Sequence, residues 1–291
     1  MTNITSRSYD DLHDHQDVMR FLRKSFAETR CLENWLPPRF ENNSRDMDIG
    51  IRIWEDDREI IGLAVPESPL LYFIQLHPKF LGIYGKIVSW VEQQVKVEGE
   101  KVKLSIIELE GIQYREKQLR SLGYIKGDVY GILRIRDVHE QIPDYRLPSG
   151  FSVRSVTRDD YNKLAACIRQ VFGHGDWFTK EILETLSQAS FYKPDLDLVV
   201  IDTSGRIVSF CTFRLDAPSG ITELEPMGTL RDYRGRGIGR ALICEGLRRL
   251  EVYDPSFVYI GGAANTPAAN HLYEVTGFTQ KHMLYYWGKT V

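Results

Sequence analysis

A similar alternation of apolar and polar positions occurs twice along the chain. Residues 51–65 (IRIWEDDREIIGLAV) and residues 198–215 (LVVIDTSGRIVSFCTFRL) each contain two alternating runs around a polar turn. Such a pattern is typical of a β-hairpin. The two hairpins correspond at an offset of 147 residues, at which Glu59 matches Arg206. We therefore interpret them as equivalent parts of two repeats.

Further correspondences follow in the same order. A strand-like run with an arginine opens each half, at Arg7 and Arg154, and a predicted helix follows it. After the hairpin, a strand leads through a loop into an apolar-periodic helix, at residues 69–95 and 223–250. Each half then ends with another strand and another helix. Four matches in order indicate a tandem duplication of an α/β unit.

The segment between the two halves has the composition of a linker. Residues 139–150, HEQIPDYRLPSG, contain two prolines and a final glycine. These residue types interrupt helices and strands. We therefore predict a first domain over 1–140, a linker over 141–150 and a second domain over 151–291.

The composition is that of an ordinary globular protein. Of the 291 residues, 43% are apolar and 26% are charged, and the formal net charge is −3. This balance predicts neither a nucleic-acid partner nor a membrane partner. The four cysteines lack metal-binding spacing, so no metal site is predicted. The sequence has neither an apolar leader at its start nor an apolar run long enough to span a membrane, and we expect a cytoplasmic protein.

The strongest chemical signal is a glycine-rich turn at residues 234–240, RGRGIGR. It follows a predicted strand and opens an apolar-periodic helix. Glycine permits backbone paths that a Cβ atom obstructs, and the N–H groups at a helix N-terminus attract anions. Across residues 231–250, six arginines occur with only Asp232 and Glu245 as acidic residues. The turn therefore predicts a site for a di- or polyphosphate.

The glycine spacing bears on which ligand this is. A dinucleotide fold needs G-x-G-x-x-G after the first strand of its unit, and a P-loop needs G-x-x-x-x-G-K-[ST]. Here the spacing is G-x-G-x-G, after roughly the fourth strand of its half. The spacing therefore counts against a nucleotide-binding oxidoreductase. The alternative that the glycines serve only a tight turn between strand and helix stays open.

Two runs of the second half resemble the signatures of one family. Residues 234–239 resemble the R/Q-x-x-G-x-G/A signature of the GCN5-related N-acetyltransferases, the GNAT superfamily. Residues 265–278 resemble its second signature, N…A-x-x-L-Y-E-x-x-G-F. One extra residue before Tyr273 means that the asparagine contacting the coenzyme is either Asn265 or Asn270. The resemblance covers the second domain in motif and the first domain in arrangement only.

The resemblance implies both a fold and a donor. The fold is α/β, with two tandem acyl-CoA N-acyltransferase (GNAT) domains, each a mixed, mostly antiparallel twisted sheet flanked by helices. The donor is acetyl-CoA, whose pyrophosphate would lie on the amides of the glycine turn and whose pantetheine arm would pair with the preceding strand. The positions expected to contact it are Met227, Gly228, Thr229, Arg234, Gly235, Arg236, Gly237, Ile238, Gly239, Arg240, Asn265 and Asn270.

Two residues are candidates for proton transfer. Tyr273 matches the family position that often supplies the acid for the departing thiolate, and a phenol is protonated at neutral pH. The alternative is a helix tyrosine that only packs against the sheet. Glu223 and Glu225 share one face of a strand, and Glu225, which lies nearer the expected thioester, is our candidate base. Its alternatives are a solvated face or a partner for a substrate ammonium.

The loop after the first helix of the second half is a weaker candidate. In this family that region shapes the acceptor pocket, so His174 and Asp176 are candidates for acceptor contact, against an ordinary loop role. Trp177 and Phe178 either line that pocket or belong to the core, and the core is favoured. His271, near Tyr273, is expected at the surface.

The first half lacks these groups. At the repeat offset, Tyr84 stands where the second half has Gly237, and Leu119 stands where it has Tyr273. Tyr72 replaces Glu225. We therefore predict a degenerate, non-catalytic copy that binds no coenzyme.

The predicted activity is transfer of an acetyl group from acetyl-CoA to a primary amine of a small molecule, by direct attack on the thioester. The alternative from another class is a non-catalytic sensor that binds acetyl-CoA. The sequence shows neither a strongly acidic cleft nor a peptide-binding signature. Polyamine, amino-acid, antibiotic and protein amines therefore all stay open as acceptors.

Overall fold

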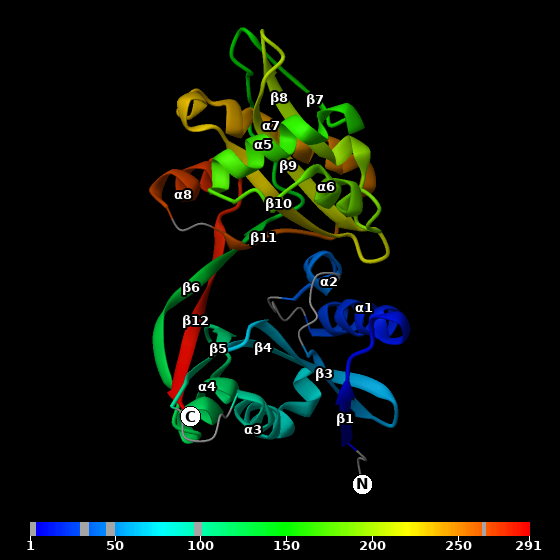
Figure 1. Ribbon diagram of the computed structural model, residues 1–291, viewed down its shortest axis with the longest axis vertical. Helices are drawn as coiled ribbons and strands as arrows, with labels where there is room; N and C mark the ends of the chain where they lie inside the picture. The colour runs from blue at the N-terminus through cyan, green and yellow to red at the C-terminus, as the bar shows by residue number, and fades with distance from the viewer. Residues whose placement is uncertain (1–3, 30–34, 45–49, 96–100, 264–265) are drawn as a thin grey trace. The chain divides into compact units, whose positions relative to one another are not determined.

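The computed structural model describes residues 4–29, 35–44, 50–95, 101–263 and 266–291. Its contacts divide the chain into two units. Unit 1 comprises Met1–Leu133 and His282–Val291, and unit 2 comprises Arg134–Lys281 (Figure 1). None of the helices in the described ranges combines the length and the apolar character that crossing a membrane requires.

Unit 1 is a mixed sheet flanked by helices. Its strands follow the order β1-β2-β3-β4-β5-β12-β6. The pairs from β1 to β4 and the pair β5–β12 are antiparallel, whereas β4 and β5 are parallel. The elements are β1 (Ile4–Ser8), α1 (Asp11–Thr29), α2 (Pro37–Ser44), β2 (Arg52–Asp56), β3 (Glu59–Ser68), β4 (Leu71–Leu76), η1 (Pro78–Ile83), α3 (Tyr84–Val95), β5 (Lys103–Leu109), α4 (Gln113–Ser121), β6 (Ile125–Arg136) and β12 (Gln280–Thr290).

Unit 2 repeats this plan. Its described pairs from β7 to β10 are antiparallel, and β10 and β11 are parallel. The elements are β7 (Phe151–Ser155), η2 (Arg158–Asp160), α5 (Tyr161–Phe172), α6 (Lys180–Leu186), η3 (Pro194–Leu196), β8 (Asp197–Asp202), β9 (Ile207–Asp216), β10 (Ile221–Thr229), η4 (Arg231–Tyr233), α7 (Ile238–Leu250), η5 (Glu251–Tyr253), β11 (Phe257–Ala263) and α8 (Pro267–Glu274).

The tandem repeat predicted from the sequence is confirmed by the element order. It is also visible in one local contact. In each unit the arginine of the first strand pairs with an aspartate at the following helical turn, Arg7 with Asp14 and Arg154 with Asp160, both at 2.6 Å. The same aspartates also accept a backbone N–H at the start of that turn. A carboxylate placed there is stabilised by the helix N-terminus as well as by the arginine.

The boundaries of units 1 and 2 differ from those of the predicted domains at two segments. The last strand of the chain, β12, pairs antiparallel with β5 from Leu284↔Leu109 to Thr290↔Lys103, and residues 282–291 therefore lie in unit 1. Residues 134–150 lie in unit 2. The division at 140 and 150 was based on composition, and composition does not indicate which strands pair.

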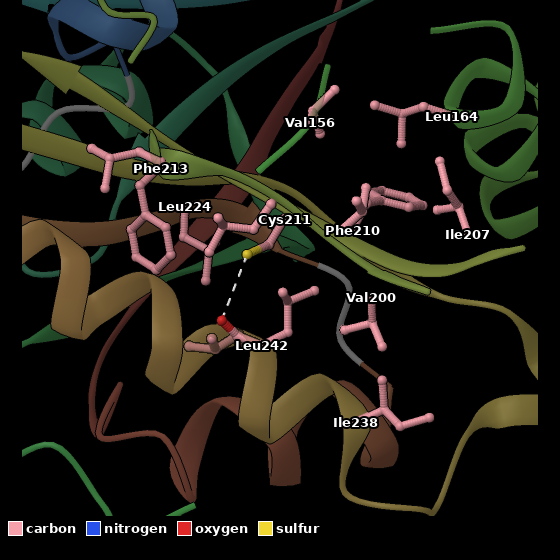
Figure 2. Close-up of a cluster of buried hydrophobic side chains, with 14 of the residues drawn as sticks. Val156, Leu164, Val200, Ile207, Phe210, Cys211, Phe213, Leu224, Ile238 and Leu242 are labelled. Atoms are coloured by element: carbon pink, nitrogen blue, oxygen red, sulfur yellow. Dashed lines mark hydrogen bonds between the residues drawn. The ribbon is translucent and has the colours of Figure 1, made fainter. Parts of the chain in front are cut away.

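The core of unit 2 lies on both faces of β9. Neighbouring side chains of a strand point to opposite faces. Phe210 accordingly points towards α5, the helix that carries Leu164, whereas the Cys211 thiol points towards the carbonyl of Leu242 on α7, at 3.9 Å (Figure 2). A Cβ at Gly246 of α7 would lie 2.2 Å from the ring of Phe213, so a glycine lets helix and sheet approach closely there. Helix α7, which carries part of the site described below, is therefore packed closely against the sheet.

Candidate active site

The glycine turn before α7 has the conformation that requires glycine. Gly235 and Gly237 have φ angles of 73° and 79°, a region that L side chains rarely adopt. A Cβ at either position would meet nothing within 4 Å, so the turn borders open space. Gly237 is the N-cap of α7, and no side chain caps that end. The N–H groups of the first turn therefore point outwards without an intrahelical acceptor, as an anion site requires.

Three arginines surround this turn. Arg234 donates from Nε to the carbonyl of Thr229, and Arg236 donates to the carbonyl of Asp232, both at 2.9 Å. Arg240 donates to the carbonyl of Asp144 at the same distance. These carbonyls hold the exposed guanidinium groups in place but do not neutralise them. Their positive charge adds to that of the helix N-terminus.

Strands β10 and β11 part next to the turn. Their parallel pairing runs from Ile221↔Phe257 to Glu223↔Tyr259, whereas β10 continues along β9 as far as Thr229. Beyond Glu223, the edge of β10 that faces β11 is therefore unpaired in the described register. An extended ligand arm can add to such an edge like a strand. The predicted pantetheine positions Met227, Gly228 and Thr229 all lie on this stretch.

At one of these positions, Gly228, packing within the unit requires a glycine. A Cβ at Gly228 would lie 2.6 Å from the ring of Phe210 and 2.7 Å from Val171 of α5. The glycine is therefore required by packing inside the unit, whatever binds at the edge. The sequence carries no signal for this contact, because the three residues are distant in the chain.

Tyr273 and Glu225, the predicted acid and base, lie in one electrostatic neighbourhood. Tyr273 projects from α8 and is 8% exposed. Its burial, and then the nearby carboxylate of Glu225, raise the pKa of Tyr273 to about 12. The phenol is therefore protonated at neutral pH and able to donate. Glu225 lies in a β-bulge, where β10 shifts its register against β9 between Leu224 and Met227.

A buried arginine that the sequence analysis did not single out lies beside Tyr273. Arg134, near the end of β6, is fully buried, and its Cζ lies 5.5 Å from the ring centre of Tyr273. One guanidinium nitrogen donates to the side-chain oxygen of Asn270. The other two nitrogens, Nε and Nη1, have no partner in the described part of the chain. Arg134 belongs to the first half of the sequence, and its one signal is a charge within the apolar run ILRIR.

The remaining predicted residues occupy different places. Asn265 lies outside the described residues. His271 is exposed on α8. Glu223 is buried and forms an ion pair with Arg214 at 3.5 Å, so its carboxylate is committed to the partner strand. No group of three metal-binding side chains occurs within the described ranges.

A pocket of unit 2 opens between α5, α6 and the sheet, and Glu225 is at its lining. Its walls are mostly aromatic and aliphatic. The lining residues are Tyr161, Leu164, Ile168, Phe172, His174, Phe178, Leu183, Leu186, Phe191, Tyr192, Asp197, Phe210, Thr212, Arg214, Glu225 and Pro226. Such a concave apolar site with a few polar groups is the usual form of a small-molecule site.

The loop after α5 contributes to this pocket in part. His174 and Phe178 line it, and Arg169 of α5 holds the loop by donating to the carbonyl of Phe178 at 2.7 Å. The expectation that Trp177 is a core residue was wrong, because its side chain is 63% exposed. Its ring lies beside that of His174, with 5.0 Å between the ring centroids. Asp176 is not among the lining residues.

In unit 1, strands β4 and β5 part after Phe73↔Ile107, as β10 and β11 do in unit 2. Side chains of unit 1 occupy the gap between these two strands. There the buried guanidinium of Arg115 donates to the carbonyls of Ile74 and Leu76, both at 3.0 Å.

The same arginine belongs to a buried polar group. Arg115 pairs with Glu108 at 3.3 Å, and Glu108 also accepts a 2.6 Å hydrogen bond from the hydroxyl of Tyr84. Tyr84 stands at the position that matches Gly237. The residue that replaces the glycine thus helps to fill the gap between the strands.

The second half of the chain is similar in sequence to known acetyltransferases. Residues 160–278 match the sequence model of the acetyltransferase (GNAT) family. A mycothiol acetyltransferase of an Arthrobacter species is 28% identical over 158 residues, 51% of this chain and 48% of that protein. Another from Corynebacterium glutamicum is 32% identical over 114 residues, 38% of each chain. The chain thus aligns with about half or less of the length of these curated relatives.

Solved structures agree over almost the whole chain. A GCN5-related N-acetyltransferase from Sphaerobacter thermophilus has a TM-score of 0.67 at 20% identity and covers 99% of this chain and 95% of its own. A tandem GNAT protein from the clavulanic acid biosynthesis pathway has a TM-score of 0.66 at 11% identity, with 99% and 98% covered. At such identities the likeness concerns the fold alone. The family match is confined to residues 160–278, in the second half of the chain, and over that range the chain is similar to the acetyltransferase (GNAT) family.

Proposed function

We propose that unit 2 transfers an acetyl group from acetyl-CoA to a primary amine of a small molecule. One observation carries this proposal. The glycine turn follows the part of β10 that extends beyond its pairing with β11, and Glu225 on that part is close enough to Tyr273 of α8 to raise its pKa. A diphosphate site, an edge for an extended arm and two proton-transfer groups are what this reaction needs together.

The residues present suit the coenzyme. The first N–H groups of α7 and the arginines around them would hold the diphosphate, because Gly235 and Gly237 leave the space before the helix open. The unpaired edge of β10 at Met227–Thr229 would hold the pantetheine arm. When bound, the coenzyme supplies an activated acetyl group as a thioester.

The side chains of Glu225 and Tyr273 would then transfer the protons. Glu225 takes a proton from the acceptor ammonium, so that the neutral amine nitrogen can form its bond to the acetyl carbon. A backbone N–H of β10 stabilises the charge that develops on the acetyl oxygen. As the carbon–sulfur bond breaks, Tyr273 donates its proton to the departing thiolate, and the second proton that the nitrogen loses on becoming an amide restores the phenol. With a pKa of about 12, the phenol of Tyr273 is protonated at neutral pH and has a proton to donate.

The names of the curated relatives support acetyl transfer, and their partial coverage leaves the acceptor of this chain to experiment. Calorimetry with acetyl-CoA tests donor binding, and release of free thiol across a panel of amines tests turnover. We expect binding at one site and amine-dependent thiol release. Binding without thiol release for any amine would favour a non-catalytic sensor, and absence of binding would exclude the proposal.

A further inference from the structure

Helices α5 and α6 give the pocket of unit 2 an apolar wall. The side chains that they contribute are aliphatic or aromatic: Tyr161, Leu164, Ile168, Phe172, Leu183 and Leu186. From the sheet, Phe210 of β9 points towards α5 and lines the same pocket (Figure 2). A surface of this kind stabilises a ligand mainly by removing apolar area from water.

The polar lining groups on β8 and β9 have partners within the unit. Asp197 of β8 accepts hydrogen bonds from Thr212 Oγ1 at 2.8 Å and from Tyr192 OH at 3.0 Å. Arg214 of β9 pairs with Glu223 at 3.5 Å, and its charge acts on Asp197 as well. Because these groups compensate one another, a ligand in this pocket gains its affinity mainly from the apolar wall.

Four aromatic rings gather where α5 ends. This ring cluster consists of Phe172, His174, Trp177 and Phe178, whose contacting rings have centroids between 5.0 and 5.7 Å apart. Phe172 also lies 5.8 Å from Phe210. Phe172 is 43% exposed and Trp177 is 63% exposed. Exposed apolar rings that adjoin a pocket are typical of a surface that binds a ligand.

The backbone holds the ring cluster in place. Gly173 ends α5 with a φ of 71°, which glycine adopts without strain, and its N–H donates to the carbonyl of Arg169 at 2.8 Å. The guanidinium of Arg169 donates in turn to the carbonyl of Phe178 at 2.7 Å. A surface arranged in this way loses little conformational entropy when a ligand binds to it.

We propose that the acceptor of this site is a primary amine joined by a short linker to an aromatic ring, with the ring held between the apolar wall and the ring cluster. This inference rests on the proposed function, since it names the acceptor class of the same site. The pocket reaches β10 at Pro226, so the amine end of such a ligand lies towards the strand edge proposed for the thioester. Phe172 is then a specificity-determining residue that takes no part in the chemistry.

Three primary amines on a two-carbon linker test the body of the acceptor. The probes are 2-phenylethylamine, 2-cyclohexylethylamine and 2-(2-aminoethoxy)ethanol, which carry an aromatic ring, a saturated ring of similar size and a polar chain. With acetyl-CoA, thiol release gives kcat/KM for each. We expect 2-phenylethylamine to exceed the polar amine by about tenfold or more, because its ring is buried in the apolar pocket. We expect it to exceed the saturated amine by about threefold, because aromatic rings attract one another beyond their area.

Phe172→Leu removes a ring and keeps an apolar side chain at a partly exposed position. We expect the ratio of kcat/KM between 2-phenylethylamine and 2-cyclohexylethylamine to fall towards one in this variant. The values of kcat/KM for the polar amine and of KM for acetyl-CoA should stay within about twofold. Tyr114→Leu is the matched control, because Tyr114 is an aromatic residue of unit 1 that is 39% exposed, and it should keep the wild-type ratio.

Each outcome decides the inference. If the wild type uses the polar amine as well as 2-phenylethylamine, the inference is overturned, and this comparison needs no variant to fold. Equal values for the two ring amines overturn the aromatic assignment, and a ratio that persists in Phe172→Leu overturns the role of Phe172. If no amine releases thiol, the proposed function fails, and calorimetric titration with the same three amines then tests the pocket by itself. Equal affinities in that titration would exclude an aromatic amine site.

Discussion

The guanidinium of Arg134 lies 5.5 Å from the ring centre of Tyr273, and it also donates a hydrogen bond to Asn270. The two partners are on successive positions of one face of α8, because residues three apart are neighbours on a helix. The charge of Arg134 lowers the pKa of Tyr273, against burial and Glu225, which raise it. A residue near the end of the first repeat thus lowers the pKa of Tyr273, the proposed acid.

Replacement of Arg134 tests this relationship. Arg134→Met removes the charge that favours the phenolate, so the phenol becomes a weaker acid. We expect kcat to fall by about three- to thirtyfold, while KM for acetyl-CoA changes by less than about twofold. Arg134→Lys keeps a charge and restores part of kcat. A merely structural role predicts instead that both variants lose thermal stability together with activity, which a melting curve measures.

Tyr273→Phe tests the acid itself. Without the hydroxyl, the departing thiolate receives no proton from the enzyme, and we expect kcat to fall by about ten- to a thousandfold. The affinity for acetyl-CoA, measured by calorimetry, should stay nearly unchanged. Tyr253→Phe is the matched control, because its hydroxyl bonds to Asp195 on an exposed part of the same unit. Full activity of Tyr273→Phe would remove this residue from the mechanism.

The glycine turn allows a comparison at equal strain. Gly237 and Gly205 both have φ of 79°, and a Cβ at either would meet nothing within 4 Å. Alanine at each position should therefore cost a similar free energy of unfolding, about 1–2 kcal/mol. Only Gly237→Ala should weaken acetyl-CoA binding, by about tenfold or more, because only that turn presents the N–H groups of α7. Equal affinities for the two variants would argue that the turn does not bind the coenzyme.

Unit 1 should bind no coenzyme, because Arg115, Glu108 and Tyr84 occupy the gap between its strands. Calorimetry should give one acetyl-CoA per chain. Arg115→Met should lower the free energy of unfolding by about 3–5 kcal/mol, since it leaves the buried carboxylate of Glu108 without its cation. Chemical denaturation measures this change. A stoichiometry of two would contradict the assignment of unit 1 as a filled copy.

The raised pKa of Asp197 predicts a pH-dependent stability. In the unfolded chain an aspartate loses its proton near its ordinary pKa of 3.8, whereas folded Asp197 keeps it up to about 6. Rising pH between these values therefore favours unfolding. Relative to Asp197→Asn, which does not titrate, the wild type should lose about 3 kcal/mol of stability from pH 3.5 to pH 7. Denaturant midpoints across this range measure the difference, and a constant difference would refute the shift.

The repeat, the fold and the family were predictable from the sequence because each depends on local rules. Alternation indicates hairpins, and a positive φ at Gly235 and Gly237 is a property of a few neighbouring residues. The two signatures also lie within single strand–helix segments. These predictions are confirmed by the element order, by the solved structures and by the family match at residues 160–278. The roles assigned to individual site residues stay predictions.

Other features depend on strand register and on packing between distant segments, and only the tertiary structure decided them. Asp197 and Glu225 share a pocket because a bulge sets β10 against Thr212. Arg134 reaches Tyr273 across more than a hundred residues of sequence. No local pattern encodes such pairings, since each results from the way whole strands align. The amino-acid sequence therefore determines that a glycine turn opens α7, whereas the folded arrangement determines which residues surround Glu225 and Tyr273.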